Sequence, residues 1–119
     1  MKENLYKILT SQEWEISKAS GFITTELDLN DGFIHLSNAA QLSTTLALYF
    51  SHHEEVILLL PELTQVQDKL IYEAVDSQSK RSGKFGHLYA ELKVSQISKS
   101  WVLKRNAFEI PEDILLEAE

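Results

Sequence analysis

The pattern of hydrophobic and polar positions near the N-terminus predicts a short strand followed directly by a helix. Residues 5–9 alternate between apolar and polar character, which is typical of a strand. Thr10 and Glu13 have the spacing of a capping box, in which each side chain accepts a hydrogen bond from the other residue's backbone N–H. With Gly21 as a left-handed stop, the pattern predicts a helix over 11–20. The residues that we expect to face inward on this helix are Trp14, Ile16 and Ala19.

The next segments predict a second strand and a second helix. Residues 22–31 combine turn formers with β-branched residues, so we expect a loop or a short strand there. An Asp-Gly turn at 31–32 leads into an apolar run at 33–36 that is typical of a strand. Ser37 is placed to cap a helix, because apolar residues follow it at the spacing of an amphipathic face. That face is expected to consist of Ala39, Leu42, Leu46, Tyr49 and Phe50.

The second half of the chain predicts mainly strands. Five apolar residues in succession, closed by Pro61, are typical of a strand that is covered on both faces and central in its sheet. The polar segment DSQSKRSGKFG predicts a flexible loop, and a short helix is expected to begin at Pro111. The other predicted pieces are one helical turn at 63–66, strands at 70–75 and 98–103, an extended piece at 87–92 and a turn at 94–97.

The order of these elements favours an α+β fold. Helices gather early and strands late, whereas an α/β fold would alternate them regularly. The length of 119 residues is that of one typical domain. We therefore predict a single α+β domain over 1–103, followed by a C-terminal tail over 104–119 that can form a short helix.

Composition and charge disfavour several classes of partner. Eighteen acidic and eleven basic residues give a formal charge of −7, which opposes binding to bulk nucleic acid or to an anionic membrane, although a basic group at 80–84 is retained. The absence of cysteine excludes disulfides, thiolate metal sites and cysteine nucleophiles. The N-terminal segment has no apolar signal core, and the longest apolar run, 56–60, is too short to span a bilayer. We therefore expect a cytoplasmic protein.

The candidate chemistry centres on His35, which lies inside an apolar run. In an extended strand its side chain points the same way as that of Phe33. A helix beginning at Ser37 would place free backbone N–H groups nearby, where they suit an anion or a sugar hydroxyl. The alternative is a core histidine whose ring nitrogens bind backbone carbonyls. Substitution of His35 by alanine would separate the two, because only a core histidine is needed for folding itself.

Three further polar residues lie in predicted extended segments. His87 and Tyr89 fall on one side of their segment, where both rings can stack on a ligand and offer a hydrogen bond; the alternative is packing at the sheet edge. Glu73 aligns with the apolar residues Ile71 and Val75. A carboxylate in that company either pairs with a cation or has a raised pKa, unless it faces water from an edge strand.

The segment HHEE at 52–55 does not indicate a metal site. Adjacent residues diverge on a helix or a strand, and no second group of ligands stands at a supporting spacing. We interpret it as a solvated helix end with its histidines near the negative pole of the helix. The sequence also lacks a phosphate-binding glycine loop, the motif G-x-S-x-G, an EF-hand and a zinc signature.

Several segments, taken in order, resemble a known family. They are LYKILTSQEWEISKASGFI, DGFIHLSNAAQLSTTLALYF, VILLLP, LIYEAV and GHLYAEL, and the resemblance as a whole runs from about residue 5 to 103. The most specific of them are DGFIHLS and HLY. The chain resembles the small bacterial proteins grouped as domain of unknown function 952 (DUF952), a family without an established activity.

The resemblance implies a fold similar to that of the ADP-ribosyltransferases, a split and mostly antiparallel sheet, with two N-terminal helices here, that grips NAD in a central cleft. The order of a strand, a helix with Trp14, a glycine turn and a strand containing histidine is also similar to the N-terminal part of the RNA 2′-phosphotransferases. In those enzymes a histidine in each of the first two strands contributes to the NAD-binding site. By position His35 matches the second histidine, whereas Lys7 stands near the first and could contact a phosphate.

The resemblance further implies a set of roles at a nucleotide site. The catalytic residues would be His35, His87 and Glu73. The ligand would be NAD or a nucleotide similar to ADP-ribose, with NAD the candidate cofactor and no metal ion. The residues expected to contact it are Tyr6, Lys7, His35, Ser37 and Tyr89. Three kinds of protein remain open: an ADP-ribosyl- or phosphate-transferring enzyme, a binding module without turnover, and a scaffold or regulatory protein whose polar strand residues satisfy the core.

Overall fold

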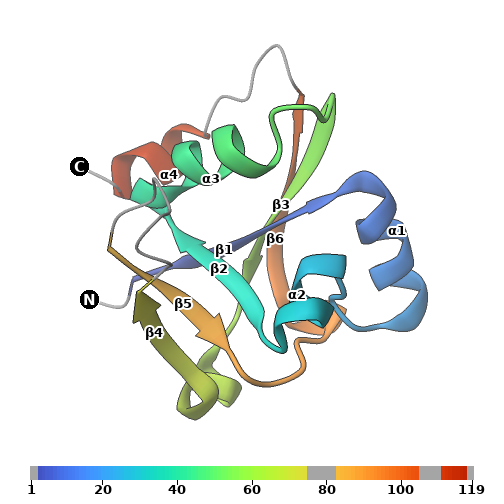
Figure 1. Cartoon of the computed structure of the whole chain (residues 1–119), viewed down its shortest axis with the longest axis vertical. Helices are drawn as coiled ribbons and strands as arrows, with labels where there is room; N and C mark the ends of the chain where they lie inside the picture. Colours follow the sequence, from blue (N-terminus) through green and yellow to red (C-terminus); the bar gives the residue numbers. More distant parts are fainter. Residues whose placement is uncertain (1–2, 75–82, 105–110, 118–119) are drawn as a thin grey trace.

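The computed structural model describes residues 3–74, 83–104 and 111–117. Six strands form one sheet in the order β4-β5-β2-β1-β3-β6, with every neighbouring pair antiparallel (Figure 1). The strands are β1 (Leu5–Thr10), β2 (Ile34–Asn38), β3 (Glu55–Pro61), β4 (Leu70–Ala74), β5 (Lys84–Leu88) and β6 (Ile97–Lys104). The helices are α1 (Ser11–Ser20), α2 (Glu26–Asp31), α3 (Leu42–Tyr49) and α4 (Glu112–Glu117), and the 3-10 helices are η1 (Ala39–Gln41), η2 (Thr64–Lys69) and η3 (Val94–Gln96). The predicted α+β class is confirmed.

Strand β1 pairs unequally with its two neighbours. It is registered with β3 at four positions, from Lys7 to Thr10, but with β2 at only two, Leu5 and Tyr6. Beyond these two positions the Lys7 side chain extends toward β2, and its Nζ donates a hydrogen bond to the carbonyl of His35 at 3.2 Å. The backbone pairing of β1 with β2 therefore ends after Tyr6, and from there the Lys7 side chain links the two strands.

The sheet separates two apolar clusters. Leu5 and Leu9 of β1 belong to one cluster, and Tyr6 and Ile8 belong to the other. Because successive strand residues point to opposite faces, each cluster covers one face of the sheet. Strand β3 contributes to both clusters and is buried throughout 56–59. The prediction that this strand is covered on both faces is therefore confirmed.

Helices α3 and α4 cover one face of the sheet, and α1 covers the other. Leu46 of α3 and Ile114 of α4 are buried in the cluster that contains Tyr6, and Figure 1 shows these two helices together, across β1 from α2. Trp14 of α1 packs against the other cluster. In the described part of the chain, no helix has the length and apolar character that crossing a membrane requires.

Helix α1 confirms the predicted boundaries and caps. The Thr10 hydroxyl accepts a hydrogen bond from the backbone N–H of Glu13 at 3.1 Å, and the Glu13 carboxylate accepts one from the backbone N–H of Thr10 at 3.0 Å. Gly21 ends the helix with φ of 87°, a conformation that costs glycine little. The boundaries were predictable because each of these signals is local in sequence.

The predicted inward face of α1 is only partly correct. Trp14 is half-buried, but Ile16 is 53% exposed and Ala19 is also exposed. The buried position belongs to Ser17, whose hydroxyl accepts a hydrogen bond from the backbone N–H of Thr24 at 3.0 Å. A polar side chain is stable there because it binds the backbone of the returning chain.

Helix α2 occupies part of the segment 22–31, for which we predicted a loop or a short strand. The Thr25 hydroxyl caps it by accepting a hydrogen bond from the backbone N–H of Asp28 at 3.2 Å, and Gly32 ends it with φ of 82°. The sequence prediction is therefore wrong for most of this segment. Two local caps outweigh the β-branched and turn-forming composition on which that prediction rested.

The predicted cap at Ser37 is also wrong. Ser37 lies inside β2, where its hydroxyl hydrogen-bonds the Thr45 hydroxyl at 3.1 Å. Asn38 begins η1 instead, because its side chain and the backbone N–H of Gln41 are 2.9 Å apart while the Gln41 side chain accepts from the Asn38 N–H at 2.9 Å. The helical segment therefore begins one residue later than predicted, with Asn38 rather than Ser37 as its cap.

The second half of the chain follows the prediction closely. The turns predicted at 63–66 and 94–97 appear as η2 and η3, and the predicted final strands appear as β4 and β6. Strand β5 begins at Lys84, inside the segment that we predicted as a loop, so that part of the prediction is wrong; residues 75–82 lie outside the described residues. Helix α4 follows Pro111 and contributes Ile114 to the core.

Gly86 of β5 leaves no room for a larger residue. A Cβ atom at this position would lie 2.7 Å from Leu5 Cδ1 and 3.3 Å from Leu70 Cδ1. We expect Gly86→Ala to lower the free energy of unfolding by about 1–3 kcal/mol, the usual cost of overpacking, as measured by urea denaturation. The Leu5→Val background provides the control, because valine lacks the δ carbons. An equal cost of Gly86→Ala in both backgrounds would contradict a steric origin.

Candidate functional site

Strands β2 and β5 place two histidines opposite each other. His35 and His87 are registered partners, so both side chains leave the same face of the sheet. Their ring centroids are 5.5 Å apart. Phe33 lies on the same side, with its ring 4.6 Å from that of His35 and 4.1 Å from that of His87. The predicted common face of Phe33 and His35 is therefore confirmed, and the pairing of the strands adds a second histidine to it.

His35 is held by two carboxylates of α2. Its Nδ1 lies 2.7 Å from Asp28 Oδ1, and its Nε2 lies 2.9 Å from Asp31 Oδ2. The backbone N–H of His35 also donates to Asp28 Oδ1, at 3.1 Å. An imidazolium ring can donate to both carboxylates, whereas a neutral ring can donate to only one. The ring nitrogens thus bind side-chain carboxylates rather than the backbone carbonyls of the core alternative.

Asp28 also forms a buried ion pair with Lys7. The Lys7 Nζ lies 2.9 Å from Asp28 Oδ1 and 2.8 Å from Oδ2, with both side chains more than nine-tenths buried. The contact at Oδ2 lacks hydrogen-bond geometry and is therefore electrostatic. Burial by itself would raise the pKa of Asp28, but the hydrogen bonds from His35 and the charge of Lys7 outweigh burial and lower that pKa. Asp28 is therefore an ionised anchor for both neighbours.

His87 is oriented by a different carboxylate. Its Nδ1 lies 2.9 Å from Glu73 Oε1, and the Tyr89 hydroxyl donates a hydrogen bond to the same oxygen at 2.6 Å. These bonds from Tyr89 and His87 lower the pKa of Glu73, and the bond to Glu73 raises the pKa of Tyr89. Of the alternatives that the sequence left for Glu73, the raised pKa is wrong. Glu73 lies in the edge strand β4 with its side chain 41% exposed, and from there it pairs with His87.

The tautomer that this geometry favours leaves one ring nitrogen of His87 available. If Nδ1 donates its proton to Glu73, Nε2 carries the lone pair and can accept a proton. Within residues 3–74, 83–104 and 111–117, Nε2 of His87 has no hydrogen-bond partner. His87 and Glu73 together therefore have the arrangement of a general base and the group that orients it.

The two histidines form part of the lining of a small cleft between α2 and α3. Its walls include Leu27 and Asp31 from α2 and Thr45 from α3. The enclosed volume is about 120 Å³. Sites for drug-sized ligands usually measure about 300–1,000 Å³, so this histidine cleft has room for one ring or one sugar rather than for a whole dinucleotide.

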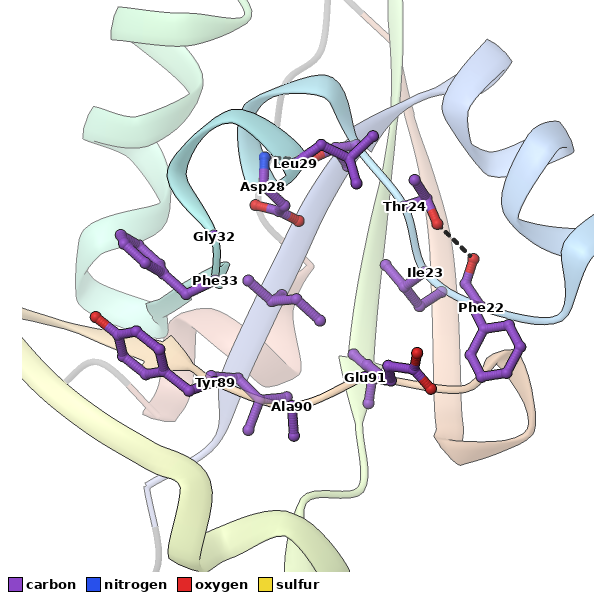
Figure 2. A pocket seen from close by; sticks show the side chains of 14 residues that line it. Phe22, Ile23, Thr24, Asp28, Leu29, Gly32, Phe33, Tyr89, Ala90 and Glu91 are labelled. Atoms are coloured by element: carbon purple, nitrogen blue, oxygen red, sulfur yellow. Dashed lines mark hydrogen bonds between the residues drawn. The ribbon is translucent and has the colours of Figure 1, made fainter.

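A second hollow, of about 450 Å³, opens on the other face of β2 and β5. Figure 2 shows Phe33 and Tyr89 at one end of this hollow and Phe22 and Glu91 at the other, with Asp28 lying above. Its lining is mostly apolar and includes neither histidine. Phe33 lines this second hollow and also contacts both histidine rings, whereas His35 and His87 themselves line the histidine cleft.

The structure brings together five of the seven residues that the sequence singled out, namely Lys7, His35, Glu73, His87 and Tyr89. Of these five, Lys7, His35 and His87 line the histidine cleft, whereas Tyr89 lines the second hollow. Tyr6 and Ser37 line the histidine cleft too, but their hydroxyls are already hydrogen-bonded, that of Ser37 to Thr45. The Tyr6 hydroxyl donates to Glu117 Oε2 at 2.7 Å. Burial, followed by the hydrogen bond to Glu117, raises the pKa of Tyr6. The functional roles of all seven residues stay predictions.

Sequence reasoning missed Asp28 and Asp31, because it did not predict the helix that carries them. The available signal was the spacing of Thr25 three residues before Asp28, with Gly32 beyond as a stop. That pattern would have predicted a short capped helix and placed its last residue, Asp31, next to the following strand.

The histidines at 52–53 lie in the turn after α3 and are exposed. His53 contacts Phe50, with ring centroids 5.8 Å apart. This placement confirms the interpretation of a solvated helix end for the two histidines, whereas Glu55 begins β3 and is half-buried. In the parts of the chain that are described, no three histidine, aspartate or glutamate side chains are arranged to hold a metal ion.

Comparisons with known proteins reveal similarity over nearly the whole chain. A family model described as Protein of unknown function (DUF952) matches residues 8–100. The crystal structure of protein CC0527 from Caulobacter crescentus is 34% identical, covers 98% of this chain and 99% of that chain, and has a TM-score of 0.77; a double mutant of CC0527 gives the same values. The solution NMR structure of CC0527 is 35% identical, with coverage of 92% and 91% and a TM-score of 0.71. No curated protein matches the chain.

Proposed function

The chain belongs to the DUF952 family of proteins of unknown function, and for this member we propose that the histidine cleft binds a nucleotide-like ligand such as NAD or ADP-ribose through its sugar. The observation that carries the proposal is the pairing of His35 with His87 across two strands, each ring being held at Nδ1 by a carboxylate. Rings held in this way are preorganised, His35 to bind a hydroxyl of the ligand and His87 to take a proton from an attacking hydroxyl. The cleft volume of about 120 Å³ suits one sugar of such a ligand.

His35 would bind a sugar hydroxyl or a phosphate oxygen. Its contact with Asp28 is buried and fixes the ring, whereas the Asp31 side chain at Nε2 is 42% exposed. A ligand oxygen can therefore replace the Asp31 carboxylate at Nε2 without disturbing the buried anchor. Such an exchange keeps the ring nitrogen hydrogen-bonded both with and without ligand.

His87 would act as a general base in ADP-ribosyl transfer. As the bond between the ribose C1′ atom and the nicotinamide nitrogen breaks, nicotinamide leaves with the bonding electrons and the sugar develops oxocarbenium character. An acceptor hydroxyl attacks C1′ and gives its proton to His87 Nε2. Glu73, bound to Nδ1, stabilises the imidazolium that forms. The products are the ADP-ribosylated acceptor, nicotinamide and one proton, which His87 releases to water.

The interrupted pairing of β1 and β2 supports a sheet split similar to that of the ADP-ribosyltransferases. The two strands pair only at Leu5 and Tyr6, and the histidine cleft lies over the region beyond them.

Lys7 supports a second candidate function, ligand binding without turnover. It stands near the position of the first-strand histidine of the RNA 2′-phosphotransferases, and its ammonium is committed to the buried pair with Asp28, so it is not free to bind a phosphate. Turnover assays therefore accompany the binding test.

Titration of isotopically labelled protein with NAD and with ADP-ribose, followed through backbone amide shifts, tests the binding proposal. We expect saturable shifts centred on His35, Glu73 and His87. The variant His35→Ala should remain folded, as judged by the dispersion of its amide signals, and should weaken ADP-ribose binding at least tenfold because it removes the ring that binds the ligand. His52→Ala is the matched control, since His52 is exposed and does not line the histidine cleft.

Two outcomes would contradict the proposal. An absence of saturable shifts at millimolar NAD and ADP-ribose would remove nucleotide binding at this cleft. Loss of folding in His35→Ala would instead favour the alternative in which His35 serves the core, because a histidine needed only for a ligand leaves the fold intact.

A further inference from the structure

The histidine cleft continues into a larger hollow on the same side of the sheet. This second space, the outer cleft, has a volume of about 500 Å³ and extends between α1, α2 and the end of α3. The two share five lining residues, Lys7, Ile8, Leu27, Tyr49 and Phe50. A ligand whose sugar lies over the histidines would therefore have its remainder directed into the outer cleft, which is within the usual size range for a small-molecule site.

The rings that line the outer cleft are those of Tyr49, Phe50 and His53, and the last two are in contact with each other. Phe50 and His53 follow α3, and their ring centroids are 5.8 Å apart with an interplanar angle of 50°. The backbone N–H of His53 donates to the Phe50 carbonyl at 3.1 Å, which holds both residues in one turn. Phe50 is half-buried and His53 is exposed, so the face of the His53 ring is accessible to a ligand. Aromatic platforms of this kind stack on nucleobases.

Two amide side chains, Gln12 of α1 and Asn30 of α2, line the same hollow. Within the described residues neither side chain has a hydrogen-bond partner, and each offers both a donor and an acceptor. A nucleobase presents matching donors and acceptors along its edge. The amides come from α1 and α2 and the rings follow α3, so a planar group between these elements would meet both.

The charges of the outer cleft favour an uncharged ring over a phosphate. Both oxygens of Glu13 accept backbone hydrogen bonds, from Thr10 at 3.0 Å and from Glu26 at 3.1 Å, and Glu26 adds a second carboxylate to the lining. The Lys7 ammonium is already paired with Asp28. A phosphate inside this hollow would therefore face carboxylates without an available ammonium, so we expect the pyrophosphate of ADP-ribose to stay in solvent at the mouth of the outer cleft while the neutral base enters it.

We propose that the outer cleft is the base-binding part of the ligand site, in which a neutral nucleobase stacks on His53, packs against the tilted ring of Phe50 and hydrogen-bonds Asn30 and Gln12. This inference rests on the proposed function, because it assumes that the sugar lies over His35 and His87. It adds a substrate class: the ligand is a nucleotide that carries its base, and a sugar phosphate alone uses only part of the site.

Calorimetric titrations with ADP-ribose and with ribose 5-phosphate test the inference. We expect the unmodified protein to bind ADP-ribose more tightly than ribose 5-phosphate. His53→Ala and Asn30→Ala should each weaken ADP-ribose binding, by about tenfold for the loss of a stacked base at His53, and should leave ribose 5-phosphate binding unchanged. Both positions are exposed, so these variants should fold normally. His52→Ala is the matched control, because His52 adjoins His53 but does not line the outer cleft.

The outcomes separate this inference from the proposed function. Equal affinity for the two ligands, or identical behaviour of His53→Ala and His52→Ala, would overturn the base-binding site and leave sugar binding at the histidines intact. A failure of both ligands to bind the unmodified protein would overturn both proposals. Weaker binding of both ligands to His53→Ala would also overturn the assignment, because a base-binding residue does not affect a ligand without a base.

Discussion

Replacing Asp28 with asparagine should lower the free energy of unfolding by about 3–5 kcal/mol, the usual cost of breaking a buried ion pair by removing one partner. The substitution leaves the Lys7 ammonium buried without a counter-charge, because Lys7 is only 3% exposed. It also weakens the hydrogen bonds that Asp28 accepts from the backbone and ring of His35. Urea denaturation at neutral pH measures the effect.

A double-mutant cycle separates the ion pair from the other roles of Asp28. Lys7→Met removes the buried ammonium and keeps a side chain of similar length. We expect the double variant Lys7→Met/Asp28→Asn to lose less free energy of unfolding than the two single variants lose in total. The reason is that the double variant contains neither an unpaired ammonium nor an unpaired carboxylate. Strict additivity would contradict a strong Lys7–Asp28 interaction.

The lowered pKa of Asp28 predicts how the stability of the protein changes in acid. The pKa of Asp28 is lower in the folded protein than its ordinary value of 3.8. The unfolded chain therefore binds the proton more readily, so the stabilisation from Asp28 is present above about pH 4 and is lost as the pH falls through the folded pKa. The stability difference between the unmodified protein and Asp28→Asn should consequently shrink when both are compared at low pH rather than at neutral pH.

The substitution His87→Gln should reduce NAD turnover by about 10²–10⁴-fold, the range attributed to general acid–base catalysis. Glutamine retains hydrogen-bonding atoms near Glu73 but cannot accept the proton of an attacking hydroxyl. Release of nicotinamide in the presence of acceptor RNA or protein measures the effect, and ADP-ribose affinity should change little. His52→Ala again provides the control.

Two results would contradict this role for His87. Equal turnover by His87→Gln and the unmodified protein would show that Nε2 takes no proton during the reaction. A parallel loss of ADP-ribose affinity and turnover would instead assign His87 to ligand binding. If the unmodified protein binds ADP-ribose but never releases nicotinamide, the binding function without turnover becomes the better account of the cleft.

The features of the fold that could be predicted from the sequence are those with local causes. The capping box of Thr10 and Glu13, with Gly21 as a stop, specifies α1 through signals that all lie between Thr10 and Gly21. The common side of Phe33 and His35 follows from the period of a strand alone. Ser17 shows the limit of such reasoning, because its burial depends on the backbone of Thr24 in a later segment.

The candidate site could be predicted only in part because its partners meet through tertiary structure. The opposition of His35 and His87 depends on the register of β2 with β5, which no local pattern states. The carboxylates of Asp28 and Asp31 depend on α2, a helix of six residues that is too short to show a clear apolar period. The sequence therefore predicted the two histidines but not Asp28 and Asp31, the two acids that bind His35.

The carboxylate of Glu13 has a consequence for the motion of the protein. One oxygen accepts from the first backbone N–H of the capping box at Thr10, and the other accepts from the backbone N–H of Glu26 at the start of α2. Fraying at the start of α1 would release both bonds together, so we expect the two helices to open together in local unfolding. Because Leu27 and Asp31 of α2 line the histidine cleft, we expect the stability of α1 to affect the shape of that cleft.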